Sequence, residues 1–240
     1  MAKLTKDEQK VLAARTAIDT LISEGKLTSG MKLGLGTGST AMPAVKRIAE
    51  RIADDTLRDI RAVATSFQTE NACQELGIPV YSMNARAIAG KLDLTIDGAD
   101  AIDRDCNLIK GGGAALLREK IVAYNSTRFV IVADSSKAVD GLGNGFPLPV
   151  EIIPEARVSV VQILETMGAA CTLREGIKKC GPVITDNGNQ LLDCLWKSPV
   201  DPVVMETELK QIPGVVETGF FTHLLPTVFI AHEDGHVEIR

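Results

Sequence analysis

The sequence predicts an α/β protein with a mainly parallel, Rossmann-like sheet flanked by helices, and a second, smaller α+β domain of the ferredoxin-like kind. Two observations support this prediction. From residue 31 to residue 134, short apolar runs alternate with helical patterns, as in βαβ units. After residue 146 the pattern changes to separate helices and β-like runs. We therefore expect residues 1–146 and 219–240 to form the α/β domain and residues 147–218 to form the small domain.

The α/β part begins with a long expected helix. Thr5 and Glu8 have the spacing of a capping box, and the apolar residues that follow recur at helical intervals. The later elements are bounded by glycines and polar turns. The expected strands span residues 31–35, 60–65, 79–83, 92–97 and 128–134, and the expected helices span residues 41–53, residues 68–76 and a segment after Gly113.

The small domain and the C-terminal tail have turn and cap signals of their own. A helix is expected over residues 155–167, and two β-like runs within residues 183–195 flank an Asn-Gly turn. The Asp-Pro pair at residues 201–202 is a helix N-cap with proline in the first helical position. Residues 227–239 form a hairpin candidate around an Asp-Gly turn, and this hairpin could return to the first sheet.

The composition disfavours several classes of partner. The chain has 240 residues, of which 26 are basic and 31 acidic, so its formal net charge is −5 and neither nucleic acid nor an anionic membrane is the expected partner. No run approaches the ~18 apolar residues of a membrane span, and the N-terminus lacks the apolar core of a signal peptide, so we expect a cytoplasmic protein. The five cysteines include no CxxC pair, which favours reduced thiols over a disulfide framework or a zinc site.

The first polar segment, GLGTGST at residues 34–40, follows an expected strand. It is neither a P-loop nor a complete GxGxxG fingerprint, because Ser39 stands at the position of the third glycine. One interpretation is a phosphate site, since the amides, the hydroxyls and the dipole at a helix N-terminus suit an anion. The other is a tight strand-to-helix turn in which Ser39 or Thr40 is the N-cap. The motif alone does not decide between the two.

The second polar segment, DGADAIDRD at residues 97–105, contains two aspartates that directly follow an expected strand. Asp97 and Asp100 flank a Gly-Ala turn at the position where open α/β sheets bind ligands. Carboxylates in this position accept hydrogen bonds from sugar hydroxyls or transfer protons. We expect the other acids of the segment, Asp103 and Asp105, to lie in a solvated loop.

A calcium site in this segment is not expected. Asp103, Asp105 and Asn107 have the spacing of the first three ligands of an EF-hand loop. The match ends there, because Leu108 occupies the position of the obligatory glycine and Ala114 the position of the closing glutamate. The sequence therefore predicts no metal site.

The third polar segment, KGGGAALLREK at residues 110–120, places a lysine and three glycines before an expected helix. Glycine lets a backbone approach a neighbouring group closely, and Lys110 is suited to neutralise an oxyanion. Glu119 has only apolar residues three and four positions away in the expected helix, which predicts a partly desolvated carboxylate whose raised pKa suits a general base. The alternatives are a glutamate that reaches solvent at the edge of the apolar stripe and a surface lysine.

Together, these motifs closely resemble those of the type A ribose-5-phosphate isomerases. GLGTGST, DGAD, KGGGAALLREK, ADSSK, FPLPVEIIP and ITDNGN occur in this order, so the resemblance extends over nearly the whole chain. It implies interconversion of ribose 5-phosphate and ribulose 5-phosphate in the pentose phosphate pathway, through an enediolate and without a metal or an organic cofactor. We also expect a homo-oligomer, either a homodimer or a tetramer.

The resemblance also implies a set of site residues. The catalytic residues are Glu119 as the base, Asp97 and Asp100 as the acids that bind sugar hydroxyls and open the ring, and Lys110 as the electrophilic group. The substrate-binding residues are Thr37, Gly38, Ser39, Thr40, Gly98, Ala99, Gly111, Gly112, Gly113 and Lys137. The chain departs from the family at Ala101, where an acidic residue commonly follows DGAD. We expect this departure to alter the charge of the loop and to leave the chemistry intact.

Two other functional classes remain open at this point. A sugar-phosphate sensor domain of related fold would keep the phosphate loop and lack the base, whereas this chain has both Glu119 and Lys110. A coenzyme A transferase-like or dinucleotide-binding enzyme would need a complete glycine fingerprint or an acyl-accepting glutamate, and neither is evident.

Overall fold

The computed structural model describes residues 3–240, which form two compact units. The first unit contains the described residues up to Ala99, together with Arg118–Lys137 and Leu224–Arg240. The second unit contains Asp100–Leu117 and Ala138–His223. The domain boundaries expected from the sequence stay a prediction.

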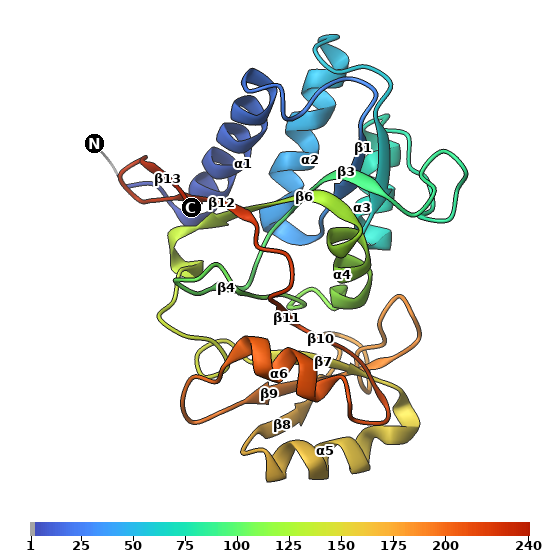
Figure 1. The fold of residues 1–240 in the computed structure, drawn as a ribbon, viewed down its shortest axis with the longest axis vertical. Helices are drawn as coiled ribbons and strands as arrows, with labels where there is room; N and C mark the ends of the chain where they lie inside the picture. The colour runs from blue at the N-terminus through green and yellow to red at the C-terminus, as the bar shows by residue number, and fades with distance from the viewer. Residues whose placement is uncertain (1–2) are drawn as a thin grey trace. The chain divides into compact units, whose positions relative to one another are not determined.

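The first unit is built on a six-stranded sheet in the order β13-β12-β6-β3-β1-β2 (Figure 1). Its strands are β1 (Lys32–Leu35), β2 (Arg61–Ala64), β3 (Leu92–Asp97), β6 (Ser126–Asp134), β12 (Thr227–Ala231) and β13 (Val237–Ile239). All neighbours are parallel except β13, which pairs antiparallel with β12. The mainly parallel sheet and the return of the C-terminal hairpin are therefore confirmed. The strand order reverses between β1 and β3, so the carboxyl ends of these two strands form the topological switch point.

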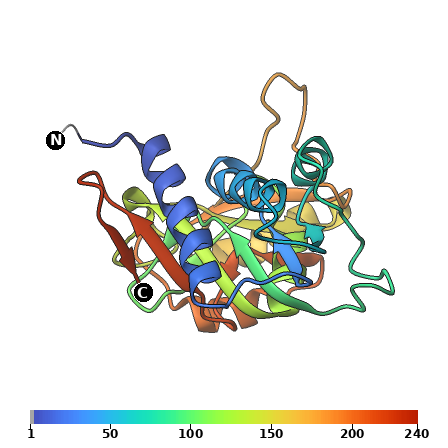
Figure 2. The same ribbon diagram turned by 90° about the horizontal axis from the view of Figure 1, so that it is seen from above.

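Helices connect and cover these strands. They are α1 (Lys6–Ser23), α2 (Gly38–Ala53), α3 (Phe67–Glu75), α4 (Leu116–Tyr124) and the 3₁₀ turn η1 (Ser135–Lys137). The expected capping box begins α1, because the backbone amide of Glu8 donates to the Thr5 hydroxyl and the amide of Thr5 donates to the Glu8 carboxylate. Figure 2 shows α1 lying across β6 and β12. Among residues 3–240, no helix combines the length and the apolar character that crossing a membrane would need.

The two faces of the sheet are packed differently. On one face, Ile18 of α1 and Ile48 of α2 join Leu33 and Leu35 of β1 in the main apolar core. Gly34 lies between these two leucines and therefore faces the other side of the sheet. A Cβ atom there would lie 2.4 Å from a methyl carbon of Val122 in α4. The glycine thus allows α4, the helix that carries Glu119, to pack close to β1.

One expected strand, over residues 79–83, does not form. Val80 makes only an isolated bridge to Ala62 of β2, with hydrogen bonds from the Ala62 amide to the Pro79 carbonyl and from the Tyr81 amide to the Ala62 carbonyl. The chain then turns at Ser82, whose hydroxyl accepts a hydrogen bond from the backbone amide of residue 84. The apolar run was correctly recognised as extended, but it is too short at the edge of the sheet to continue as a ladder.

The second unit has a ferredoxin-like βαββαβ order (Figure 1). Its elements are β7 (Leu148–Ile152), the 3₁₀ turn η2 (Pro154–Ala156), α5 (Arg157–Thr166), β8 (Ala170–Leu173), β9 (Gln190–Leu195), α6 (Pro202–Leu209) and β10 (Val215–Thr218). The four strands form an antiparallel sheet in the order β10-β7-β9-β8. Both helices pack on one apolar core, through Val160 and Leu164 of α5 and Met205 and Leu209 of α6. The expected fold of the small domain is therefore confirmed.

The second unit also corrects details of the sequence prediction. Asp201 caps α6 as expected and accepts hydrogen bonds from the amides of residues 203 and 204. Of the two runs expected around the Asn-Gly turn, only β9 is a strand, and it pairs with β7 and with β8, a strand that was not expected. Residues 183–186 instead form an irregular segment that closes on the Asn-Gly turn. A third sheet of short strands, β11 (Phe220–Phe221), β5 (Leu108–Ile109) and β4 (Ala101–Ile102), was also not expected.

Two cysteines of the second unit lie opposite each other on β8 and β9. The register pairs Cys171 with Cys194, and their sulfur atoms are 3.6 Å apart. In the same register the Arg174 amide donates to the Leu191 carbonyl at 2.9 Å, so hydrogen-bonded pairs fall on alternate residues and the cysteines form a non-hydrogen-bonded pair. Such pairs have Cα atoms about 4.5 Å apart, which a disulfide can span. The hydrogen bond between the two thiols lowers the pKa of Cys171.

We expect oxidised glutathione to couple these two thiols to each other. The Cys171 thiolate attacks the glutathione disulfide and releases one glutathione, and Cys194 then displaces the second, so two protein thiols become one disulfide. Mass spectrometry should show the loss of two hydrogens and a cross-link between the peptides of residues 171 and 194. Cys194→Ser should stop at a mixed disulfide on Cys171. Cys73 is the internal control, because burial raises its pKa to about 11. Reaction confined to Cys180 would contradict this expectation.

Candidate active site

The switch point of the main sheet holds a buried aspartate. Asp97, the last residue of β3, is 1% exposed, and its Oδ1 accepts hydrogen bonds from the amides of Thr37 at 3.2 Å and Gly98 at 2.7 Å. The loop after β1 can approach it this closely because residue 36 is glycine: a Cβ on Gly36 would lie 1.9 Å from the Asp97 Oδ1. The GLGTGST and DGAD segments therefore meet at the carboxyl ends of adjacent strands.

The glycine segment leads into helix α2, whose N-cap side chain forms hydrogen bonds outside the helix. α2 begins at Gly38, and its N-cap is Thr37, so the expectation of Ser39 or Thr40 as N-cap was wrong. The Thr37 hydroxyl makes no capping hydrogen bond and instead lies 2.6 Å from the hydroxyl of Thr65 and 2.8 Å from that of Ser66. These partners follow β2, which the sequence did not link to this loop. Thr37 therefore does not cap α2, and of the first-turn amides that of Gly38 donates to the Gln68 Oε1 at 3.2 Å. The amides that follow leave this helix N-terminus suited to an anion.

A lysine of α1 lies beside this helix N-terminus. The Lys10 Nζ is 3.3 Å from the Ser39 hydroxyl, and the Lys10 side chain is 16% exposed. It also pairs with Asp7 at 2.9 Å. Sequence analysis missed Lys10, because the residue belongs to no motif and its contact depends on the packing of α1 against α2. The only local signal was its place two residues after the capping box that begins α1.

The same turn of α1 contacts the ADSSK segment. The Gln9 Oε1 accepts hydrogen bonds from the amide of Ser135 at 3.2 Å and from its hydroxyl at 3.0 Å. Asp134 accepts hydrogen bonds from Ser136 and shapes the 3₁₀ turn that ends at Lys137. Lys137 is half-buried in this turn, immediately beyond the carboxyl end of β6. Neighbouring residues of α1 therefore contact two of the segments expected to bind substrate.

Glu119 lies in the first turn of α4 and is buried. Its exposed fraction is 4%, so the alternative of a glutamate that reaches solvent at the helix edge was wrong. The neighbouring residues Ala115, Leu116 and Val122 are buried as well, which confirms the apolar surroundings expected from the helical spacing. The carboxylate is therefore largely removed from bulk water.

The second unit carries the other predicted catalytic groups. The half-buried Asp100 accepts a hydrogen bond from the Gly112 amide on its Oδ2, at 2.7 Å. Lys110 is 3% exposed, so it is not the surface lysine of the alternative interpretation, and its Nζ lies 5.5 Å from the centre of the Phe221 ring. Gly111 has φ +101°, which favours glycine, whereas Gly112 and Gly113 are exposed.

The acids after DGAD form a turn. Asp103 is 8% exposed and accepts hydrogen bonds from the amides of Asp105 and Asn107 and from the Asn107 side chain, so the expected solvation of Asp103 was wrong. Asp105 is exposed as expected. Ala101, the position that departs from the family, is buried in β4. Within residues 3–240, no three His, Cys, Asp or Glu side chains are grouped to hold a metal ion.

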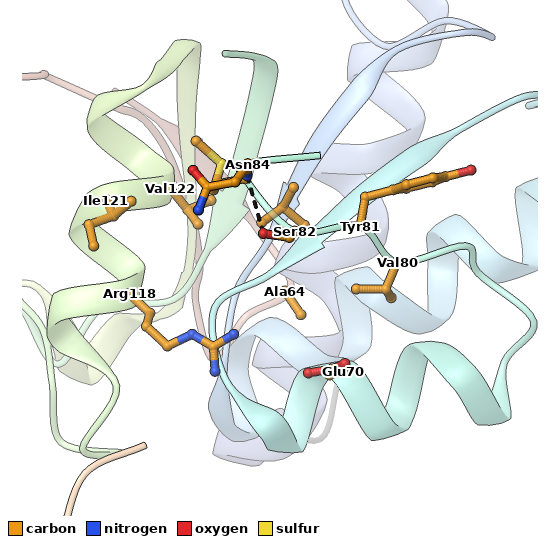
Figure 3. Close-up of a pocket in the computed structure, with 11 residues that line it drawn as sticks. Ala64, Glu70, Val80, Tyr81, Ser82, Asn84, Arg118, Ile121 and Val122 are labelled. Carbon is orange, nitrogen blue, oxygen red and sulfur yellow. Dashed lines mark hydrogen bonds between the residues drawn. The ribbon is translucent and has the colours of Figure 1, made fainter. Parts of the chain in front are cut away.

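A cavity of about 470 Å³ in the first unit includes none of the predicted site residues. Arg118 of α4 and Glu70 of α3 extend into it, and Ser82 and Asn84 line its other side (Figure 3). The Arg118 guanidinium also lies 5.2 Å from the centre of the Phe67 ring. This cavity therefore lies on the side of α4 that Arg118 and Ile121 face, and Glu119 does not line it.

The fold and the side chains at the switch point define a class: an α/β protein in which a buried aspartate accompanies a helix N-terminus suited to an anion. The family model described as ribose 5-phosphate isomerase A (phosphoriboisomerase A) matches residues 61–235. The ribose-5-phosphate isomerase A of Treponema denticola is 58% identical, over 95% of this chain and 97% of its own length. That of Treponema pallidum is 54% identical, over 97% of this chain and 92% of its own length.

Solved structures agree with these sequence comparisons. A D-ribose-5-phosphate isomerase in complex with phospho-erythronic acid superposes with a TM-score of 0.91, at 37% identity over 99% of both chains. The ribose 5-phosphate isomerase A of Methanocaldococcus jannaschii gives a TM-score of 0.87, at 37% identity over 97% of both chains. The chain therefore belongs to the ribose 5-phosphate isomerase A family, and it is an isomerase.

Proposed function

We propose that this protein interconverts D-ribose 5-phosphate and D-ribulose 5-phosphate through an enediolate, with Glu119 as the general base. The observation that carries this proposal is the burial of Glu119 to 4% exposure on a helix that directly follows the lysine and three glycines. A buried carboxylate is a stronger base than a solvated one, because desolvation disfavours its charged form. The membership of the family supports an isomerase over the sensor and the coenzyme A transferase-like alternatives.

The substrate phosphate is assigned to the start of α2. The amides of its first turn and the hydroxyls of Ser39 and Thr40 supply donors, and the helix dipole favours negative charge there. Lys10, 3.3 Å from Ser39, adds a full positive charge. Lys137 is a further substrate contact in this proposal. Binding energy from the phosphate, remote from the reacting carbons, would position those carbons for the proton transfer.

The remaining groups are assigned to the reacting carbons. Asp97 and Asp100 bind sugar hydroxyls and assist the opening of the furanose ring. Glu119 then removes the proton from C2 of the open aldehyde, and the electron pair of that C–H bond forms the C1–C2 double bond of the enediolate. Lys110 and amides of the glycine run other than that of Gly112, whose N–H donates to Asp100, stabilise the charge that develops on O1. Return of the proton to C1, together with transfer of the O2 proton to O1, gives the ketose.

The wider setting of the reaction stays part of the proposal. We infer a role in the pentose phosphate pathway, in the cytoplasm, for a homo-oligomer that needs neither a metal nor an organic cofactor. The proposal also assigns substrate binding to residues with small or no side chains. These are Gly98 and Ala99 of the DGAD turn and the glycines after Lys110. Ala99 is 7% exposed, so its contribution is a backbone one.

The direct test is incubation of the protein with ribose 5-phosphate alone, followed by detection of the ketose. We expect ribulose 5-phosphate to accumulate to equilibrium. In deuterium oxide, we expect deuterium to enter the product at C1, to the extent that the base exchanges its proton with the solvent. Folded protein that gives no ketose would overturn the assignment. Ribose without the phosphate is the matched control, and it should turn over far more slowly because the anion site then contributes no binding energy.

Lys10→Met tests the anion site. We expect the KM for ribose 5-phosphate to rise about 10-fold or more, because a charge-assisted hydrogen bond contributes roughly 1.5–3 kcal/mol, and we expect kcat to change less. Steady-state kinetics at two ionic strengths measure both constants. Lys91→Met is the control, since Lys91 is exposed and precedes the amino end of β3. An unchanged KM for the Lys10 variant would place the phosphate elsewhere.

A further inference from the structure

Arg174 links the small antiparallel sheet to the glycine run. It follows β8 and is 16% exposed at its side chain. Its Nη1 donates to the carbonyl of Gly111 at 2.9 Å and to that of Gly112 at 3.2 Å. Its Nε and Nη2 donate to the two carboxylate oxygens of Asp193 in β9, at 2.9 and 2.5 Å. All four residues belong to the second unit.

The bidentate pair with Asp193 fixes the plane of the guanidinium. A fork-to-fork contact between arginine and a carboxylate restricts the orientation of both groups, which a single hydrogen bond does not do. Asp193 is held in turn by the ladder of β9, which pairs with β7 and β8 on both sides. The remaining edge of the guanidinium therefore has a fixed direction, and it faces two successive carbonyls of the glycine run.

Fixing a carbonyl also fixes an amide. The carbonyl of Gly111 and the N–H of Gly112 belong to one planar trans peptide unit and point in opposite directions. Arg174 holds this unit at its carbonyl, and Asp100 accepts from its N–H at 2.7 Å. The Gly112 carbonyl orients the N–H of Gly113 in the same way. Arg174 therefore determines where two amides of the run point and supports the position of the Asp100 carboxylate.

The glycine run needs such a restraint. Three successive glycines have more backbone freedom than any other tripeptide, and they carry no side chains that could anchor them by packing. Gly112 and Gly113 are exposed, so burial does not restrict them either. Donors that stabilise a developing charge act only when their direction is set before the reaction. The Arg174 guanidinium provides this direction by binding the carbonyl oxygens of Gly111 and Gly112, and it makes no contact with the N–H groups of the run that would occupy them.

We propose that Arg174, oriented by Asp193, is a positioning residue of the isomerase reaction that holds the Gly111–Gly113 backbone in its working geometry. This inference rests on the proposed function, which assigns the same backbone to the enediolate oxygen. Arg174 acts through the glycines and Asp100, so its loss should affect the transition state more than the binding of the sugar phosphate.

Arg174→Met and Arg174→Lys test this inference, because methionine retains much of the apolar volume and lysine retains the charge without the fork. We expect Arg174→Met to lower kcat on the order of 10- to 100-fold, as for a displacement of about 1 Å at a reacting centre. KM should change less, and Arg174→Lys should recover part of the loss. Asp193→Asn should show a smaller loss in the same direction. Arg157→Met, an exposed arginine of α5, is the matched control.

Two inhibitors separate positioning from a purely structural effect. Phospho-erythronic acid has a planar carboxylate besides its phosphate, so its affinity reports on donors near the reacting carbons, whereas inorganic phosphate reports on the anion site alone. We expect the Arg174 variants to bind phospho-erythronic acid more weakly, by about the factor lost in kcat, and to bind inorganic phosphate as the parent does. Binding is measured on folded protein, verified by thermal unfolding.

The outcomes distinguish the two proposals. If the parent does not isomerise ribose 5-phosphate, the proposed function fails. If the parent isomerises and both Arg174 variants retain its kcat per folded molecule, the positioning role is overturned while the function stands. Equal weakening of both inhibitors would also overturn it, because it would indicate a general loss of structure. Should Arg174→Met not fold, Arg174→Lys and Asp193→Asn give the same comparison.

Discussion

Glu119→Gln is expected to abolish isomerisation while leaving the protein folded. Glutamine has nearly the same size and helix preference as glutamate but lacks the basic oxygen. Glu119 is 4% exposed, so the substitution replaces a buried charge by a neutral group, which costs less to bury. We therefore expect the variant to remain folded. General base catalysis contributes roughly 10²–10⁴-fold, and a carboxylate that carries the proton between two carbons contributes at least that much.

The measurement is exchange of the C2 hydrogen with solvent deuterium, recorded together with ketose formation. Both should fall in Glu119→Gln. Lys110→Ala is the comparison, because it should weaken stabilisation of the enediolate and leave the base in place. Glu75→Gln, the same change on an exposed position of α3, controls for the substitution itself. If the Glu119 variant exchanged and isomerised near the parent rate, the base would have to be sought among Asp97 and Asp100.

Gly36→Ala should be almost as damaging, although it adds a single methyl group. The new Cβ would lie 1.9 Å from the Asp97 Oδ1 and 2.6 Å from the Asp97 Cα, so a side-chain rotation alone cannot make room for it. The loop after β1 and the end of β3 must separate, which breaks the hydrogen bond from Thr37 to Asp97. Displacement by about 1 Å costs roughly 10²-fold in rate, and overpacking lowers the free energy of unfolding by about 1–3 kcal/mol.

Gly145→Ala is the control for this prediction, because a Cβ there meets nothing within 4 Å and the residue does not need a positive φ. Chemical denaturation gives the free energy of unfolding, and steady-state kinetics give kcat/KM for both variants. Parent-like activity of Gly36→Ala would show that Asp97 tolerates displacement and does not need its position at the switch point.

Local signals explain what the sequence predicted. The parallel sheet, the first helix and the ferredoxin-like unit rest on apolar periodicity, caps and turn dipeptides, each confined to a few neighbouring residues. The two-residue strands β4 and β5 are too short for any periodicity, and β8 shows only weak alternation of burial. The extended run at residues 79–83 has the composition of a strand, but whether it joins a sheet depends on the edge strand it meets.

The site shows the same division. Asp97, Lys110 and Glu119 stand in recognisable motifs, and all three are buried, as was expected in part for Glu119. Lys10 and Arg174 stand in no motif, and their partners lie 29 and more than 60 residues away along the chain. Such contacts arise from the packing of α1 on α2 and from the register of β8 on β9, which a single sequence does not encode locally.

The capping box at the start of α1 has a consequence for rotational phase. Each helical residue turns by about 100° around the axis, so the position of the first turn decides which side chains face which neighbours further along. Thr5 and Glu8 fix that start. Gln9 and Lys10, the next two residues, thereby face the turn after β6 and the hydroxyl of Ser39. A slip of the helix start by one residue would rotate Lys10 away from α2 by more than a quarter turn. The exposed side chains of Thr5 and Glu8 therefore determine the direction in which the Lys10 ammonium group points.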